Sequence, residues 1–237
     1  MNEENKDLFV PGPLYEQRKK ILEYIKRIPL KTGDIVFNAS DIKGPFSLPF
    51  ARWVQRFTNS PYSHATTMLV ENDEYYAIDV TDHGTRKIRL LDWFDDWDSY
   101  KFCIYRLKTY GSIDELNFKD AISRFLEEDP DYDYNFSDPN KYYCTEGVKR
   151  IYNECGYDLG GAYLLKDILP KWFYYLVLTG NYFFKWFSNS SLPKDKPITI
   201  VGNPQKGMMA SSYIERVFEY DAETDTSIYY VIPLDKK

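Results

Sequence analysis

The sequence predicts an α+β fold in which an antiparallel sheet packs against helices. Strand-like runs rich in β-branched and aromatic residues are concentrated between residues 31 and 108. Two segments with apolar residues at helical spacing follow, and strand-like runs return near the C-terminus. Because 237 residues are enough for one sizeable hydrophobic core, we expect a single domain overall.

Residues 1–30 are expected to form a leader and a helix. Leu14 to Ile28 carries apolar residues at helical spacing, and Pro29 ends the helix. The leader MNEENKDLFVPGP has acidic residues where a signal peptide carries basic ones, and it lacks an apolar stretch. We therefore expect a cytoplasmic protein, with peripheral membrane contact as a further option.

Residues 31–160 are expected to form the core. The polar loop Glu71 to Asp73 predicts a hairpin between two of its strands, and Phe50 to Phe57 has a short helical pattern. The aromatic segment LLDWFDDWDSY, 90–100, is interpreted as a helix or loop that packs its aromatic residues inward. The predicted strands of this core are KTGDIVF (31–37), SHATTMLV (63–70), EYYAIDVT (74–81) and KFCIYRLK (101–108).

Two helices complete this core. The first spans Ile113 to Glu128, with an apolar face that includes Leu116, Ala121, Ile122, Phe125 and Leu126, and Asp129-Pro130 ends it. The second begins at Cys144. Its core face is Val148, Ile151 and Tyr152, and Gly156 provides its C-terminal cap.

Residues 161–205 are expected to form an aromatic helical elaboration, and residues 206–237 to return to the core as strands. The uninterrupted apolar part, Trp172 to Phe184, has thirteen residues, too few for a bilayer span of about 20. It predicts a buried helical hairpin or a surface-seated membrane segment flanked by lysines. The expected substrate or membrane contacts are Trp172, Phe173 and Trp186.

Composition excludes several functions. The formal charge of -6 disfavours nucleic-acid binding, which needs a concentrated positive surface. Three cysteines without CxxC or histidine-rich spacing make neither a disulfide framework nor a zinc site. We therefore expect no metal, no cofactor and no nucleic-acid partner.

Cys144 is the candidate nucleophile. A cysteine attacks as the thiolate, which a helix N-terminus and a nearby imidazole both favour. The chain has two histidines: His64 begins a predicted strand, while His83 lies in the turn-like TDHGT and stays a backup. Asp79, on the following strand, can orient the His64 ring if the hairpin forms. The other cysteines fit less well, because Cys103 lies inside a strand and Cys155 at a helix C-terminus.

The order of these motifs resembles a known family. GDIVF, SHATTMLV, YYAIDV, YDYNF and YYCTEGVKRIY follow one another as in the circularly permuted branch of the papain-like NlpC superfamily, whose YiiX-like proteins are the closest pattern. Here His64 precedes Cys144 by eighty residues, as the permuted order requires. The resemblance covers about residues 31–156.

This resemblance implies a permuted papain-like fold and a set of site residues. Cys144 matches the nucleophile, His64 the general base and Asp79 the third polar residue. Tyr132 matches a tyrosine that can join the Cys144 backbone N–H in stabilising an oxyanion. The chain departs from the pattern where Ala65 and Thr66 replace a glycine, where Thr145 replaces serine, and where Gly147 replaces a large apolar residue.

We therefore expect a cysteine hydrolase that cleaves a peptide or lipid-linked amide through a thioester acyl-enzyme. Two alternatives stay open. A lipid acyltransferase or thioesterase at a membrane surface would bind vesicles through the aromatic segment. A non-catalytic membrane- or partner-binding module would have an unreactive thiol at Cys144.

Overall fold

In the computed structural model, the description covers residues 19, 21, 23–40, 50–81, 84–97, 99–133, 140–172, 174–175, 197–222 and 224–230, except for the side chains of 50 and 53. Within the predicted N-terminal helix, residues 19, 21 and 23–26 are helical. Ile21 and Ile25 from this segment are buried against the sheet.

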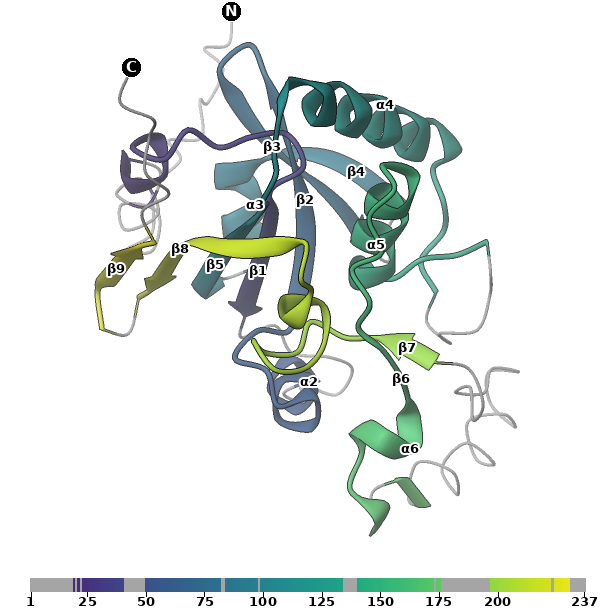
Figure 1. The fold of residues 1–237 in the computed structure, drawn as a ribbon. Coiled ribbons are helices and arrows are strands. Elements are labelled where there is room, and N and C mark those ends of the chain that lie inside the picture. Colours follow the sequence, from purple (N-terminus) through teal and green to yellow (C-terminus); the bar gives the residue numbers. More distant parts are fainter. Residues whose placement is uncertain are drawn as a thin grey trace, which may run out of the picture.

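A seven-stranded antiparallel sheet in the order β4-β3-β2-β1-β5-β8-β9 forms the centre of the molecule (Figure 1). The strands from the N-terminal half of the chain and from its C-terminal end meet at the β5–β8 pair. This arrangement confirms the predicted α+β fold with an antiparallel sheet packed against the cysteine-bearing helix. The strands are β1 Ile35–Ser40, β2 His64–Glu71, β3 Glu74–Thr81, β4 Gly84–Arg89, β5 Ser99–Leu107, β8 Ile214–Asp221 and β9 Thr226–Tyr229.

Both faces of this sheet are covered. One face packs against α4 and α5, which lie together in Figure 1, and the other against α3 and the N-terminal helical residues. Successive side chains of strand β2 point to opposite faces of the sheet. Ala65 and Leu69 belong to the core on the α4 and α5 side, and Met68 belongs to the core on the α3 side. The helices are α2 Phe50–Thr58, α3 Leu90–Asp96, α4 Ser112–Glu128, α5 Cys144–Glu154, α6 Leu165–Ile168 and the short 3₁₀ helix η2 Met208–Ala210.

The hairpin between β2 and β3 forms as predicted. Glu71 pairs with Glu74, and the two turn residues Asn72 and Asp73 have φ of 51° and 62°. Asparagine and aspartate tolerate this left-handed conformation better than most residues, which explains their place in a two-residue turn. The hairpin sets Thr67 opposite Ile78 and so brings Asp79 beside the start of β2.

Two local predictions were incomplete. The polar strand β4, GTRKIR, was not predicted, because it follows a turn and carries little of the apolar alternation that identifies a half-buried strand. Leu116 was placed on the apolar face of α4, but it is 63% exposed, and Phe118 occupies the core instead. Phe118 stacks edge-on against Tyr152 of α5, which fixes how the two helices meet.

At Gly147, α5 packs closely against the sheet. A Cβ atom there would lie 2.8 Å from Val80 Cγ2 and 3.2 Å from Phe125 Cζ. Val80 belongs to β3 and Phe125 to α4, and both side chains are buried. The large side chain that the family pattern places here is thus replaced by Phe125, which fills the same space from another helix.

We expect Gly147→Ala to destabilise the protein by about 1–3 kcal/mol through overpacking. Alanine favours a helix over glycine by about 1 kcal/mol, so an exposed site would show the opposite sign. Urea unfolding of the variant measures the net effect. A variant more stable than wild type would mean that Val80 and Phe125 yield easily.

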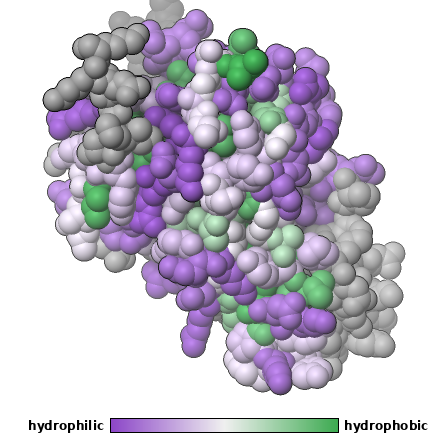
Figure 2. All heavy atoms as spheres, in the orientation of Figure 1, coloured by the Kyte–Doolittle hydropathy of each residue, from purple (hydrophilic) through white to green (hydrophobic). Residues whose placement is uncertain are grey.

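Residues 161–205, expected to be helical, also contribute strands. β6, Ala162–Leu164, pairs with β7, Pro197–Thr199, in a separate two-stranded sheet. Figure 2 shows hydrophobic residues gathered in the lower part of the view, over β6 and α6, among a largely polar surface. Phe173 and Trp186 lie outside the described residues. No helix within the described ranges is long and apolar enough to cross a bilayer.

Candidate active site

Three side chains singled out in the sequence come together where β2 and α5 begin. His64 is the first residue of β2, and Cys144 is the first residue of α5. The Cys144 side chain lies next to the His64 ring, close enough for its charge to act on the pKa of the imidazole. On the other side of the ring, His64 Nε2 lies 2.7 Å from Asp79 Oδ1. Because Nε2 is engaged by Asp79, the ring atom left for the thiol is Nδ1.

Asp79 is held by three donors at a fully buried position. Besides the His64 bond, Trp97 Nε1 donates to Oδ2 at 2.9 Å and Arg86 Nη2 donates to the same oxygen at 3.2 Å. Burial alone would raise the pKa of this carboxyl, but the charge and hydrogen bond of His64, then Trp97 and Arg86, lower it below its usual range. Asp79 is therefore a fixed negative charge next to Nε2 of the imidazole.

The His64 ring lies between Cys144 and Asp79. Burial lowers the pKa of the imidazole, but the charges of Cys144 and Asp79 and their hydrogen bonds outweigh it and raise the pKa from 6.5 to about 10. At neutral pH the ring therefore keeps its second proton. A buried imidazolium next to a thiol is the kind of neighbour that cysteine nucleophiles use.

Trp97 also restrains the imidazole from its face. The two rings stack with centroids 3.8 Å apart and an interplanar angle of 28°. Trp97 caps the C-terminus of α3, and the buried Trp93 of the same helix lies 5.9 Å from the His64 ring. This stack, together with the Nε1 bond to Asp79, fixes the plane of the ring and limits access of water to the His64–Asp79 bond.

Sequence reasoning missed Trp97 and Arg86 as site residues. Arg86 stands directly opposite Asp79 in the β3–β4 register, but β4 itself was not predicted. Its other nitrogen, Nη1, pairs with Asp96 of α3 at 2.6 Å. The tryptophan spacing in LLDWFDDWDSY was the available signal, and the prediction that these aromatic residues pack inward is confirmed for Trp93.

The turn that presents Cys144 is held by β7. Thr145 Oγ1 donates to the Thr199 carbonyl oxygen at 2.8 Å, and the Thr199 N–H donates to Tyr143 Oη at 2.5 Å. Thr145, where the family pattern has serine, thus uses its hydroxyl to hold the turn.

Glu146 acts on the same turn from within the helix. It is the third residue of α5, close to Tyr143, the residue before the helix, which acts to lower its pKa. Burial, together with the nearby Asp133, raises the pKa of Glu146 to about 7.

The expected oxyanion groups are the Cys144 N–H and the Tyr132 hydroxyl. The Cys144 N–H is in the first turn of α5, where backbone N–H groups have no partner within the helix. The backbone of Tyr132 pairs with Tyr142 in an isolated parallel bridge, next to the chain that leads to Cys144. The Tyr132 side chain packs against the main core. Its part in catalysis stays a prediction.

The remaining thiols and the second histidine stand apart from this cluster. Burial raises the pKa of Cys103 and of Cys155 to about 12 each, which disfavours their thiolates. His83 lies outside the described residues. Among the residues that are described, no group of three or more His, Cys, Asp or Glu side chains could hold a metal ion.

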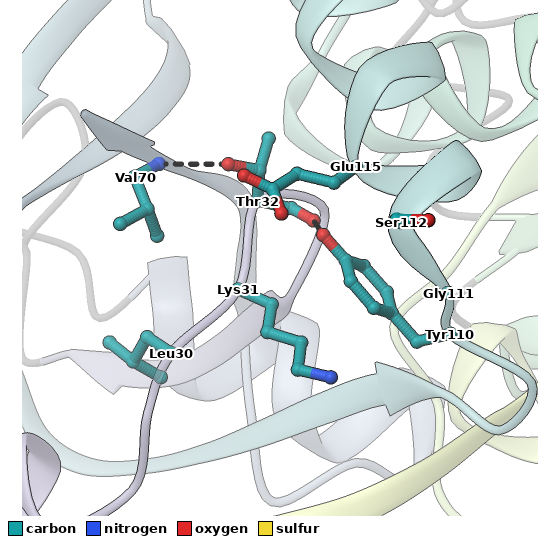
Figure 3. A pocket seen from close by; sticks show the side chains of 8 residues that line it. All are labelled: Leu30, Lys31, Thr32, Val70, Tyr110, Gly111, Ser112 and Glu115. Atoms are coloured by element: carbon teal, nitrogen blue, oxygen red, sulfur yellow. Dashed lines mark hydrogen bonds between the residues drawn. The ribbon is translucent and has the colours of Figure 1, made fainter.

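A cavity of about 300 Å³ lies away from these residues (Figure 3). It is bounded by Lys31 and Thr32, by Val70, and by Tyr110 at the approach to α4. Val70 is six residues along β2 from His64, which corresponds to roughly 20 Å of strand. Thr32 closes one side by accepting from the Val70 N–H and, through its carbonyl, from the Tyr110 hydroxyl.

Comparison with known proteins gives one family and one fold. Residues 29–174, more than half of the chain, match the model of a permuted papain-like amidase enzyme, YaeF/YiiX, of the C92 family. No curated protein matches the chain. A similar solved structure is YiiX from Escherichia coli O157:H7, described as a metalloprotein. It is 23% identical, with a TM-score of 0.60, over 79% of this chain and 96% of that one. At this identity the likeness shows the fold, while the family match places the chain among the YaeF/YiiX permuted papain-like amidases of family C92.

Proposed function

We propose that the protein is a cysteine hydrolase that cleaves an amide bond through a thioester, with Cys144, His64 and Asp79 as its catalytic group. The observation that carries the proposal is the position of His64, which lies next to the Cys144 thiol and makes a 2.7 Å hydrogen bond with Asp79. Membership of a family of amidases supports the amide as the scissile bond.

In the first step, the Cys144 thiolate attacks the carbonyl carbon and forms the C–S bond. The carbonyl oxygen takes the negative charge, which the Cys144 N–H and the Tyr132 hydroxyl are proposed to stabilise. The His64 imidazolium then gives its Nδ1 proton to the leaving nitrogen as the C–N bond breaks. A thioester and a free amine result.

In the second step, neutral His64 takes a proton from water as the water oxygen attacks the thioester. The C–S bond breaks, the carboxylic acid leaves, and the thiolate–imidazolium pair is restored. Asp79 holds the ring in place through Nε2 in both steps and stays ionised. Neither metal nor organic cofactor enters this proposal.

Acylation by 4-nitrophenyl acetate tests the nucleophile directly. We expect intact mass spectrometry to show one acetyl group on wild-type protein, located on the Cys144 peptide, and none on Cys144→Ala. Cys103→Ala is the matched control, because it removes another thiol and should leave the acetylation unchanged. Acetylation that persists in Cys144→Ala would contradict the proposal.

The raised pKa of His64 predicts a particular pH dependence. An amide needs its leaving nitrogen protonated, and the imidazolium supplies that proton below its pKa of about 10. Single-turnover acylation by an amide substrate should therefore hold from neutral pH and fall as pH rises through about 10. Acylation by the 4-nitrophenyl ester, whose leaving group needs no proton, is the control and should not fall there. A decline of the amide reaction near pH 6.5 would mean an unperturbed histidine.

A second candidate function is membrane binding through the segment that follows α6. Trp172 is 69% exposed and Tyr175 is 66% exposed, and Lys166 and Lys171 lie beside them in the chain. Exposed aromatic residues with nearby lysines are typical of segments that sit at a lipid interface. Such contact would suit a lipid-linked amide, or an acyltransferase or thioesterase acting on acyl lipids.

Sedimentation with liposomes tests this membrane contact. Trp172→Ala/Tyr175→Ala should reduce binding to phosphatidylglycerol vesicles several-fold, while Ile113→Ala/Leu116→Ala, which removes two exposed apolar residues from α4, should not. Equal binding by both variants would favour a peptide amide that is cleaved away from membranes.

A further inference from the structure

A groove beside the start of β2 is lined mainly by hydrogen-bond donors. Its volume is about 550 Å³. The chain as a whole carries an excess of acidic residues, with a net charge of -6, yet none of the described residues that line this groove is acidic. Its polar lining residues are Arg52, Gln55, Arg56, Asn59, Ser60 and Tyr100.

Two arginines on one face of α2 supply the positive charge. Arg52 and Arg56 are four residues apart, so their side chains project from the same side of the helix. Both arginines are exposed. A guanidinium group binds carboxylate and phosphate oxygens with two parallel hydrogen bonds, so two such groups on one helix face suit an oxyanion.

Neutral donors complete the lining. Gln55 Nε2 donates to the Pro61 carbonyl at 3.0 Å and to Tyr100 Oη at 3.4 Å. Because Tyr100 Oη accepts this bond, its own hydrogen is left to donate. The Ser60 hydroxyl also keeps its hydrogen for donation, because its Oγ accepts from the Tyr62 N–H at 3.0 Å. The two hydroxyls are thus oriented by the protein and keep a proton for a ligand.

Two short chain segments connect the residues of the groove to the proposed catalytic residues. Ser60 is four residues before His64, a separation of at most about 14 Å. On the other side, Asn203 Nδ2 donates to the Asn59 carbonyl at 2.7 Å, and Thr199, four residues earlier, holds the Cys144 turn. Figure 1 shows α2 beside this segment between β7 and η2.

We infer that this groove binds an oxyanion, a carboxylate or phosphate, carried by the substrate. The inference rests on the proposed hydrolase function and adds the charge of its substrate. The anion would lie between Arg52 and Arg56, with Tyr100 and Ser60 donating to it. It would hold the substrate while the amide meets Cys144.

Chloroacetyl probes test the substrate assignment. Chloroacetyl-triglycine places a carboxylate roughly 10 Å from its reactive carbon, and chloroacetyl-triglycinamide is its neutral match. In both, the Cys144 sulfur displaces chloride and forms a C–S bond. We expect the carboxylate probe to react about 10-fold faster with wild type, and about equally with Arg52→Gln/Arg56→Gln, since only its anion is held by the two arginines. Lys26→Gln/Lys108→Gln removes two exposed charges elsewhere and should keep the 10-fold ratio.

The ratio of the two probes separates this inference from the proposed function. Equal rates in wild type, or an unchanged ratio in Arg52→Gln/Arg56→Gln, overturn the substrate assignment even if Cys144 reacts readily. A probe that ends in an ethyl phosphate in place of the carboxylate shows which anion is preferred. If it reacts faster than the carboxylate probe, the substrate carries a phosphate.

A second experiment tests the anion site without depending on Cys144. Phenylglyoxal modifies arginines, and peptide mass spectrometry follows each one separately. Inorganic phosphate should slow modification of Arg52 and Arg56 several-fold and leave the exposed Arg27 and Arg89 unchanged. If Cys144 reacts with no probe, the proposed function fails, but this protection still supports an anion site. Equal modification with and without phosphate overturns the site itself.

Discussion

Replacing His64 with alanine is expected to lower the rate at which iodoacetamide alkylates Cys144 at pH 6 by about 100-fold. The imidazolium next to the thiol is the positive charge that favours the thiolate. Removing an adjacent opposite charge changes the ionised fraction of a group by about 10- to 1000-fold. Because iodoacetamide is neutral, its approach does not depend on the charge of the site, so the rate reports the thiolate alone.

Peptide-level mass spectrometry makes the comparison within one molecule. Cys103 and Cys155, whose pKa values are raised to about 12, should label slowly at pH 6 in wild type and variant alike. Asp79→Asn is the graded control, because the amide oxygen still accepts from Nε2 but the negative charge is gone. It should lower the rate about 10-fold, between wild type and His64→Ala. An unchanged Cys144 rate in His64→Ala would mean that the ring does not activate the thiol.

The sequence predicts those site residues that lie on strands or helices with a clear hydrophobic pattern. His64, Asp79 and Cys144 could be named because each lies in an element with a clear pattern, and a two-residue turn sets the register between the two strands. Arg86 could not be placed, since the polar β4 has no such pattern. Thr199 could not be placed either, because the β6–β7 pair joins segments more than thirty residues apart.

Gly147 shows the same limit within an element that was predicted well. The helix and its core face were correct, but the reason for a glycine in its first turns lies in Val80 and Phe125, which come from other elements. Leu116 and Phe118 illustrate the reverse case, because helical spacing alone did not decide which of the two faces the core. In both cases tertiary packing, which a single helical pattern does not contain, decides the outcome.

The buried ion pair between Arg106 and Asp34 is expected to have a large effect on stability. Replacing Arg106 with methionine is expected to lower the free energy of unfolding by about 3–5 kcal/mol. Arg106 Nε and Nη2 donate to the two Asp34 carboxylate oxygens at 2.8 and 2.6 Å, and the Asp34 side chain is completely buried. Methionine matches the length of the arginine stem, so packing is largely kept. The variant leaves a buried carboxylate whose charge has lost its partner.

Urea unfolding of a second variant separates the charge from the packing. Asp34→Asn/Arg106→Met removes both charges, while the asparagine oxygen can still accept from the Lys31 N–H, as Asp34 does at 2.9 Å. Because a buried ion pair is costly to break but not to replace as a whole, the double variant should recover most of the loss. Lys119→Met, which breaks the exposed pair with Glu115, should cost no more than about 0.5 kcal/mol.

The buried pair matters for the site because of where it lies. Asp34 leads into β1, and the preceding residue, Gly33, accepts a 2.5 Å hydrogen bond from Tyr152 of α5 through its carbonyl oxygen. The pair therefore anchors the segment to which the cysteine-bearing helix is attached. Arg106→Met should therefore also slow iodoacetamide labelling of Cys144 under conditions where the variant is still folded, and Asp34→Asn/Arg106→Met should restore it. Loss of stability without any change in labelling would show that this buried pair does not help to position the Cys144 turn.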